Sequence, residues 1–145
     1  MRKQNPLPWL SLLLFAGAAV AHQGVKDPQV QARMDAMSDI AAATKVLGEM
    51  ARGTRTFDAE TAQRAAVSIA EQSARVPDLF RIAATDPMSE ALPEIWENFE
   101  DFTERTRAME EAARRAVTLQ TEADLTAALA SIGETCKSCH KLYRE

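Results

Sequence analysis

The chain has 145 residues, which is room for one ordinary domain, and its 46% hydrophobic and 26% charged residues place it among globular proteins. The net charge of −4 argues against a nucleic-acid partner, because such proteins usually present a basic stripe to phosphates and no such stripe is visible. Five glycines and six prolines leave few turns. This composition favours an all-α fold of long helices with short connections.

Residues 1–21 have the three regions of a cleavable secretory signal. Arg2 and Lys3 precede an apolar run that ends at Ala21 in the sequence Ala-Val-Ala, which suits the signal peptidase. The run is too short for a comfortable membrane span of about 20 apolar residues, although an uncleaved anchor is the competing interpretation. We expect cleavage after Ala21, a mature domain of residues 22–145, and no stable membrane insertion afterwards.

Export also changes the charge of the protein. Loss of Arg2 and Lys3 from 17 basic residues, against 21 acidic ones, leaves a net charge of −6. In bacteria this predicts a periplasmic protein, and its acidity predicts a basic docking patch on any partner.

Helical periodicity predicts two helices in the first half of the mature chain. The first covers residues 28–52, with Asp27 as N-cap and Gly53 after its end. Its inward face is expected at Met34, Met37, Ala41, Thr44, Gly48 and Ala51. The second covers residues 58–76, stops at Pro77, and turns Ala62, Ala66, Ile69 and Ala70 inward. A long connection follows to Leu92, which we expect to cross an end of the fold or to cover something.

Two further helices follow. The third is predicted from Pro93 to Thr118, with its apolar face at Ile95, Phe99, Phe102, Met109, Ala113 and Ala116. The last covers residues 121–143 and aligns Leu125, Leu129, Ile132, Cys136, Cys139 and Tyr143. Four amphipathic helices of this length predict an antiparallel four-helix bundle, whose core is a suitable place for a planar cofactor.

The motif that carries chemistry is Cys136-Lys137-Ser138-Cys139-His140. Cys-x-x-Cys-His is the attachment signature of c-type haem. On a helix the two thiols lie on the same side about one turn apart, so each can form a thioether to one haem vinyl group, and His140 can bring an imidazole beneath the iron. The motif predicts one covalently attached haem c per chain, near the C-terminal helix.

Other uses of the two cysteines fit less well. A disulfide would close too small a loop to constrain the unfolded chain. A thioredoxin-like pair belongs at a helix N-terminus after a strand, and this pair is deep in the last helix. A zinc site needs a fourth ligand, and the only other histidine is His22, at the expected mature N-terminus.

The residue pattern leaves the other face of the iron open. Methionine is the remaining soft ligand. Met37 and Met34 are both candidates on the first helix, but an inward methionine is more often flexible core filler than a ligand.

From about Val30 to Arg144 the chain resembles the class II cytochromes c, the family of cytochrome c′ and its low-spin relatives. The resemblance is carried by Arg33 and Met37, by Gly53 and Phe57, by Pro93-Glu94-Ile95-Trp96 with Phe102, and by the haem motif followed by Tyr143-Arg144. These proteins are four-helix bundles with haem attached near the C-terminus, and many of them pair through the first two helices. The resemblance therefore leaves open a homodimer.

The resemblance also implies roles for individual residues. Met37 would lie on the distal side of the iron and, as in the low-spin branch, would be its sixth ligand, opposite His140. Arg33 would pair with a haem propionate, against the alternative of a solvated arginine. Trp96 and Phe102, with Phe99, would wall the haem pocket or fill the core. Arg144 resembles the family's proximal arginine, with a frayed C-terminus as the competing view.

Two functions follow as hypotheses, and neither is an enzyme. The first is a periplasmic electron carrier with His140 and Met37 as axial ligands, serving redox partners that the sequence does not name. The alternative is a five-coordinate cytochrome c′, in which Met37 only shields an open distal site that binds NO or CO, for gas sensing or protection from nitrosative stress.

Overall fold

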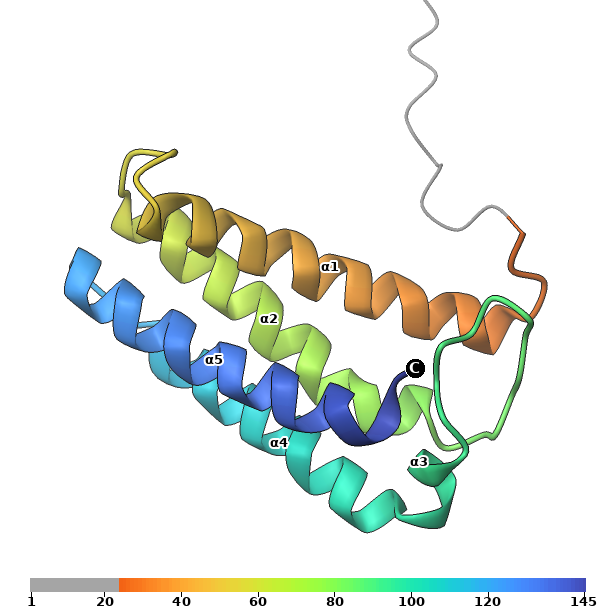
Figure 1. The fold of residues 1–145 in the computed structure, drawn as a ribbon. Helices are drawn as coiled ribbons and strands as arrows, with labels where there is room; N and C mark the ends of the chain where they lie inside the picture. Colours follow the sequence, from red (N-terminus) through yellow and green to blue (C-terminus); the bar gives the residue numbers. More distant parts are fainter. Residues whose placement is uncertain (1–23) are drawn as a thin grey trace, which may run out of the picture.

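The computed structural model describes residues 24–145, so the predicted signal peptide and His22 lie outside the described residues. The helices are α1 (Pro28–Ala51), α2 (Ala59–Leu79), α3 (Glu94–Glu97), α4 (Phe99–Ala116) and α5 (Glu122–Tyr143). The four long helices run antiparallel to their neighbours along the chain, which confirms the predicted bundle (Figure 1). Within the described residues, no helix is both long enough and apolar enough to cross a bilayer.

The ends of α1 follow from local chemistry. The Asp27 carboxylate accepts hydrogen bonds from the backbone N–H of Gln29 at 2.8 Å and of Val30 at 3.0 Å, and so satisfies donors that the helix itself leaves free. At the other end Gly53 has a φ of +70° and donates its N–H to the Met50 carbonyl at 3.0 Å. A side chain would be strained there, which is why a glycine ends the helix.

The predicted inward face of α1 is right at Gly48, which is buried, and at Met37, which packs against the core, but elsewhere it is shifted by about one residue. The buried apolar residues of α1 are Val30, Ala36, Ile40, Ala43, Leu47 and Met50, whereas the predicted Ala41 and Ala51 are exposed. The observed stripe follows Ile40 and Leu47, because burying branched side chains removes more apolar surface from water than burying alanines does.

The predicted stop of the second helix at Pro77 is also wrong. The helix α2 continues to Leu79 with Pro77 inside its last turn. Proline lacks only one N–H, and Phe80 N–H still reaches the Val76 carbonyl at 3.2 Å, so one more turn forms at the loss of a single hydrogen bond. The predicted inward face of this helix is confirmed, because its four residues are all buried.

The predicted third helix is divided in two at Asn98. Its φ of −125° and ψ of 44° are not helical, and its side-chain amide donates to the Glu94 carbonyl at 3.2 Å. Asparagine side chains compete with the helical backbone in this way. Beyond the break, the predicted apolar face of α4 is confirmed, since Phe102, Met109 and Ala113 are buried.

The last helix begins where it was predicted to begin. Thr121 and Asp124 form a reciprocal capping box at its start. The apolar face predicted for α5 is confirmed: Leu125, Ile132 and Tyr143 are buried, and Leu129 and both cysteines pack against the core.

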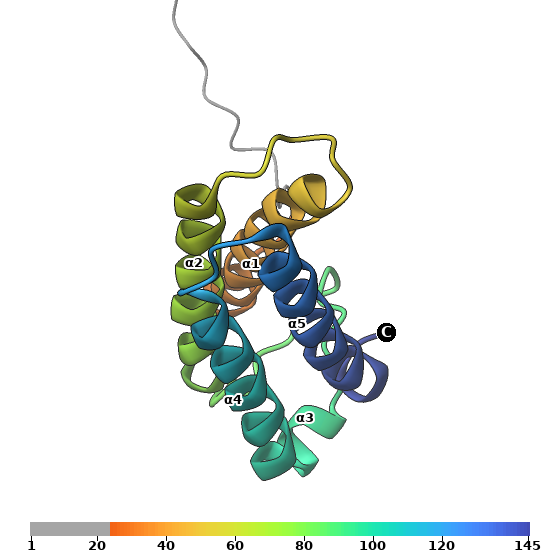
Figure 2. The ribbon, with the colours of Figure 1, turned by 90° about the vertical axis from the view of Figure 1, so that its left-hand side faces the viewer.

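The helices do not contact one another equally. α1 packs along α2, α2 along α4, and α4 along α5, while the interface between α1 and α5 is much the smallest of these neighbouring pairs (Figure 2). The connection from α2 to α3 passes the start of α1, where the Asp86 carboxylate accepts hydrogen bonds from the backbone N–H of Lys26 at 2.8 Å and Asp27 at 3.2 Å. The prediction that this connection crosses an end of the bundle is confirmed (Figure 1).

Candidate haem site

The haem motif lies in the C-terminal half of α5. Cys136 and Cys139 are three residues apart on this helix, are half-buried, and pack against the core. That spacing places both sulfurs on one side of the helix, as two thioethers to one macrocycle require. The two cysteines are not joined in a disulfide. The local structure therefore fits the covalent chemistry that the motif predicts.

The surroundings of the two thiols keep them protonated at neutral pH. Burial raises the pKa of Cys136. Burial also raises the pKa of Cys139 to about 11, with a further increase from Cys136 and Asp101, while the Arg105 guanidinium acts in the opposite direction. The Cys136 Sγ atom lies 3.9 Å from the Met109 Sδ atom of α4. Sequence reasoning placed Met109 in the core but gave no sign of this contact.

His140 follows Cys139 near the end of α5. Its pKa is lowered, first by partial desolvation and then by the neighbouring Arg144 guanidinium, while Glu90 acts in the opposite direction. A lowered pKa favours the neutral imidazole, which is the form that binds a metal through a nitrogen lone pair. The environment of His140 therefore suits an iron ligand.

Met37 and Met34 both lie on α1 but have different surroundings. Met37 is partly buried and packs against the main core cluster. Met34 is also partly buried but lies outside that cluster. The structure thus distinguishes two residues that the residue pattern alone left equivalent, and it favours Met37 as the residue directed toward the interior.

Arg33 has more partners than the sequence indicated. It is only 3% exposed. Its Nε donates to the Leu79 carbonyl at 3.0 Å, its Nη1 to the Ala84 carbonyl at 2.9 Å, and its Nη2 to the Ile82 carbonyl. The alternative of a solvated arginine is wrong. Two of its five N–H groups remain for an anion, so the propionate contact stays a prediction.

The predicted pocket aromatics belong to one cluster. Phe102 is 3% exposed, and its ring centroid lies 5.0 Å from that of Phe80 and 5.5 Å from that of Tyr143. Trp96 donates its indole N–H to the Phe80 carbonyl at 2.8 Å, and the Arg33 guanidinium carbon lies 5.2 Å from its ring centroid. Both residues fill the core at this end of the bundle. Whether they also wall the haem stays a prediction.

The C-terminus is held in place. Arg144 forms an ion pair with Glu90 through Nη2 at 2.5 Å and an isolated antiparallel bridge with Ala91. The competing view of a frayed C-terminus is therefore wrong. Leu92 donates its N–H to the Tyr143 carbonyl at 3.1 Å, and Glu145 donates its N–H to the Glu90 carbonyl at 3.0 Å. Residues 90–92 are therefore tied to the end of α5.

Sequence reasoning missed a polar group beside the motif. Asp101 and Arg105 of α4 form a bidentate ion pair, with Nε to Oδ2 at 2.7 Å and Nη2 to Oδ1 at 3.1 Å. Their i, i+4 spacing is a sequence signal for such a pair. The sequence gives no indication that Tyr143 completes the group from 42 residues away, donating to Asp101 Oδ2 at 2.5 Å.

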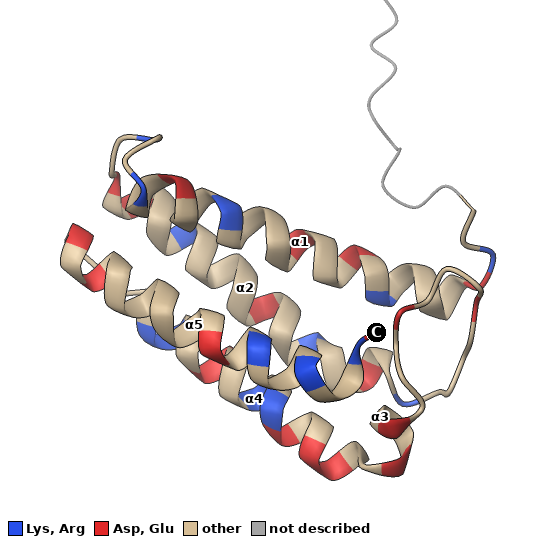
Figure 3. Cartoon of the chain, in the orientation of Figure 1, with Lys and Arg blue, Asp and Glu red and all other residues tan. Residues whose placement is uncertain are grey.

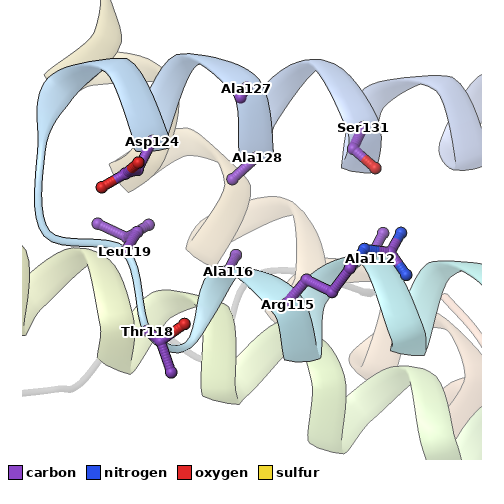
Figure 4. A pocket seen from close by; sticks show the side chains of 9 residues that line it. All are labelled: Ala112, Arg115, Ala116, Thr118, Leu119, Asp124, Ala127, Ala128 and Ser131. Atoms are coloured by element: carbon purple, nitrogen blue, oxygen red, sulfur yellow. The ribbon is translucent and has the colours of Figure 1, made fainter.

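A surface hollow of about 340 Å³ lies elsewhere, between the end of α4 and the start of α5 (Figure 4). Small side chains such as Ala112, Ala116 and Ala128 line much of it, and the predicted site residues do not line it. Among the described residues, no group of three or more His, Cys, Asp or Glu side chains could hold a bare metal ion. The donor set suits an iron held by a macrocycle, with few protein ligands of its own.

Comparison with known proteins identifies the family of the chain. A sequence profile of the family described as Cytochrome C′ matches residues 28–144. The chain is 34% identical to a cytochrome c-554 of Cereibacter sphaeroides over 97% of its own length and 98% of that protein, and 32% identical to a cytochrome c′ of Rhodopseudomonas palustris over 92% and 90%.

The fold agrees as well. A solved structure of cytochrome c′ from Rhodopseudomonas palustris superposes with a TM-score of 0.77 and 30% sequence identity, covering 83% of this chain and 98% of that one. The family profile, which matches residues 28–144, spans all five helices of the described residues and the motif on α5. The chain therefore belongs to the cytochrome c′ family and is a c-type cytochrome with covalently bound haem c.

Proposed function

We propose that this protein is a periplasmic, single-haem electron carrier, in which Cys136 and Cys139 hold the haem and His140 and Met37 are the axial iron ligands. The observation that carries this proposal is the half-buried Met37 of α1, packed on the same core as the two cysteines of α5. Of the neighbouring pairs among the four long helices, α1 and α5 pack least against each other, which supports a cofactor held between them.

The surroundings of the other methionines argue for Met37. Met50 is 5% exposed in the core near the end of α1, thirteen residues farther along the helix than Met37. Met88 is 50% exposed on the connection before α3. Met109 has its sulfur 3.9 Å from that of Cys136, so it lies beside one attachment point. Met34 and Met37 are both partly buried on α1, and of the two it is Met37 that packs against the core cluster.

The two ligands determine how the protein would transfer electrons. When bound, haem c supplies a one-electron Fe(III)/Fe(II) couple. A neutral His140 imidazole and a Met37 thioether would both be strong-field ligands, and together they would favour low-spin iron in both oxidation states. The thioether of Met37 favours Fe(II) and raises the potential relative to two histidine ligands. Little rearrangement on reduction suits exchange with periplasmic redox partners.

The test is the absorption spectrum of the holoprotein, oxidised and dithionite-reduced, before and after addition of CO. Wild type should show sharp reduced bands that CO does not change. Met37→Ala should bind CO and give broad high-spin bands, whereas the matched control Met34→Ala should behave like wild type. A wild-type spectrum that is broad and shifts readily with CO would instead identify a five-coordinate, gas-binding protein.

A further inference from the structure

An ion pair on α4 lies against the haem-attachment segment. Arg105 donates its Nη1 to the carbonyl of Ser138 at 3.4 Å, and Ser138 stands between the two cysteines of the motif. The same guanidinium holds Asp101 through two further hydrogen bonds. One positive and one negative charge therefore lie next to the turn that carries the haem, at positions fixed by directional contacts.

The pair is held more firmly than an ordinary surface ion pair. The Tyr143 hydroxyl donates to Asp101 Oδ2 at 2.5 Å, and its ring packs edge-on against Phe102 with centroids 5.5 Å apart. Tyr143 is 6% exposed, and the Arg105 and Asp101 side chains are 29% and 45% exposed. Partial burial weakens the screening of these charges by water and salt, so their effect on a neighbouring charge exceeds that of a fully exposed pair.

Arg105 is a basic residue that follows a run of acidic residues along α3 and α4. The carboxylates of Glu94, Glu97, Glu100, Asp101 and Glu104 precede it along α3 and α4, and Arg105 is the first basic residue of α4. Figure 3 shows this acidic end of α3 and α4 on the same side of the bundle as the C-terminal end of α5. A haem attached to α5 here would lie between the carboxylates of α3 and α4 and the basic residues Lys137, Lys141 and Arg144, and Arg105 is the basic residue of α4 that contacts the motif.

We propose that Asp101 and Arg105 are positioning residues that set the reduction potential of the haem, with the two charges acting in opposite senses. This inference rests on attachment of the haem at Cys136 and Cys139 with His140 as iron ligand. Oxidation adds one positive charge to the iron, so a nearby cation disfavours Fe(III) and raises the potential, whereas a nearby anion lowers it. Tyr143 would keep Asp101 in place and is not itself part of the charge effect.

The experiment is equilibrium redox titration of four holoproteins: wild type, Asp101→Asn, Arg105→Gln and the double variant. Asp101→Asn should raise the potential, Arg105→Gln should lower it, and the double variant should return toward wild type. Both single shifts should shrink as ionic strength rises. Asn keeps an oxygen for the Tyr143 hydroxyl and Gln keeps a donor amide, so the contacts are altered less than the charges. Arg105→Lys, which retains the charge, should stay near the wild-type potential.

A matched control exists at the opposite end of the bundle from the haem motif. Glu60 and Arg64 form an exposed i, i+4 pair near the start of α2 (Figure 1). Glu60→Gln and Arg64→Gln should leave the potential nearly unchanged. Loosened packing alone would move the potential of both Asp101→Asn and Arg105→Gln in the same direction, and that result would overturn the proposal, as would no shift in either.

Failure of the proposed charge effect can be distinguished from failure of the proposed Met37 ligation. The wild-type spectrum with CO reports whether Met37 is a ligand, while the opposite signs of the two shifts are expected with either five or six ligands on the iron. If Arg105→Gln does not fold or incorporate haem, Asp101→Asn and Arg105→Lys still test the charge effect. Asp101→Asn must raise the reduction potential, and Arg105→Lys must leave it near the wild-type value.

Discussion

The guanidinium carbon of Arg33 on α1 lies 4.6 Å from the centroid of the Phe80 ring at the end of α2. Together with three hydrogen bonds to backbone carbonyls, this contact joins α1 to the end of α2 and to the connection that follows it. Burial lowers the pKa of Arg33, with Asp27 acting in the opposite direction, yet arginine remains charged in proteins. A buried cation is thus stabilised by carbonyl dipoles and aromatic faces.

Removal of this cation should destabilise the bundle. We expect Arg33→Leu to lower the free energy of unfolding by about 3 kcal/mol, because three carbonyls lose a charged donor. Arg33→Lys should recover only part of the loss, since an ammonium group does not reproduce the planar fork. Urea unfolding of the holoprotein measures both. The control is Arg64→Ala, which removes an exposed i, i+4 pair with Glu60 and should change the free energy by less than about 1 kcal/mol. Equal effects at positions 33 and 64 would contradict this account.

Tyr143 should titrate above the ordinary pKa of tyrosine. Burial raises the pKa of Tyr143, and the hydrogen bond to Asp101 raises it further, while Arg105 lowers it. Since the folded-state pKa exceeds the unfolded value of about 10, the stability that Tyr143 contributes is fully present below pH 10 and is lost as the pH rises through the folded-state pKa. It is the only tyrosine in the chain, so carbon-13 NMR of labelled tyrosine in the reduced protein assigns the titration directly.

The same measurement tests the partner of Tyr143. Asp101→Asn should lower the Tyr143 pKa toward its ordinary value, because the negative acceptor is removed. Glu104→Gln, on the same helix, removes an exposed carboxylate and should leave the titration unchanged. An unshifted Tyr143 pKa in Asp101→Asn would show that the hydrogen bond does not persist in the holoprotein.

The two cysteines should each contribute one thioether. Haem in Cys136→Ser or in Cys139→Ser should remain with the polypeptide after acid–acetone extraction, because one covalent bond is enough to retain it. The double variant should release its haem completely. Extraction followed by haem staining of a denaturing gel gives the answer, and release from a single variant would show that the cysteine remaining in that variant is not bonded to the haem.

The start of α5 depends on a local cap. The Thr121 hydroxyl accepts the N–H of Asp124 at 3.1 Å, and the Asp124 carboxylate accepts the N–H of Thr121 at 2.9 Å. Thr121→Ala should therefore cost about 1 kcal/mol of unfolding free energy. Thr126→Ala is the matched control on the same helix, because the Thr126 hydroxyl donates to the Glu122 carbonyl, a contact that does not stabilise helices. Chemical denaturation compares the two, and a loss at position 126 as large as that at 121 would be evidence against the cap.

The helices themselves were predictable because their signals are local. Asp27, Asp58 and Thr121 each cap a helix within three residues along the chain, and the periodic apolar residues of α2, α4 and α5 became the core. Two predicted helix boundaries were wrong because, at each of them, helical and non-helical backbone conformations compete locally and helix propensity does not decide between them. Pro77 was tolerated inside α2 because only one hydrogen bond was at stake, and Asn98 broke the third helix through its own side chain.

Other features depended on residues that are distant in sequence. Which side of α1 faces inward was decided by the partners of Ile40 and Leu47, since an alanine-rich helix presents several faces of similar polarity. Arg33 could be singled out from its position before Met37, but its carbonyl partners lie 46 to 51 residues away. A long polar side chain reaches whichever acceptors the packed bundle brings near it, and these acceptors are not encoded next to it.

The sequence by itself determined the helical class, most helix ends, and the haem chemistry, because caps, periodicity and the Cys136-to-His140 motif act over a few residues. Only the tertiary structure decided that Met37 packs on the core while Met34 does not, that Met109 lies beside Cys136, and that Tyr143 joins Asp101 and Arg105 next to the motif. These contacts arise when helices far apart in the chain pack against one another. Burial and the rotation of each helix about its own axis are then fixed jointly by all the neighbours, and no single segment specifies them.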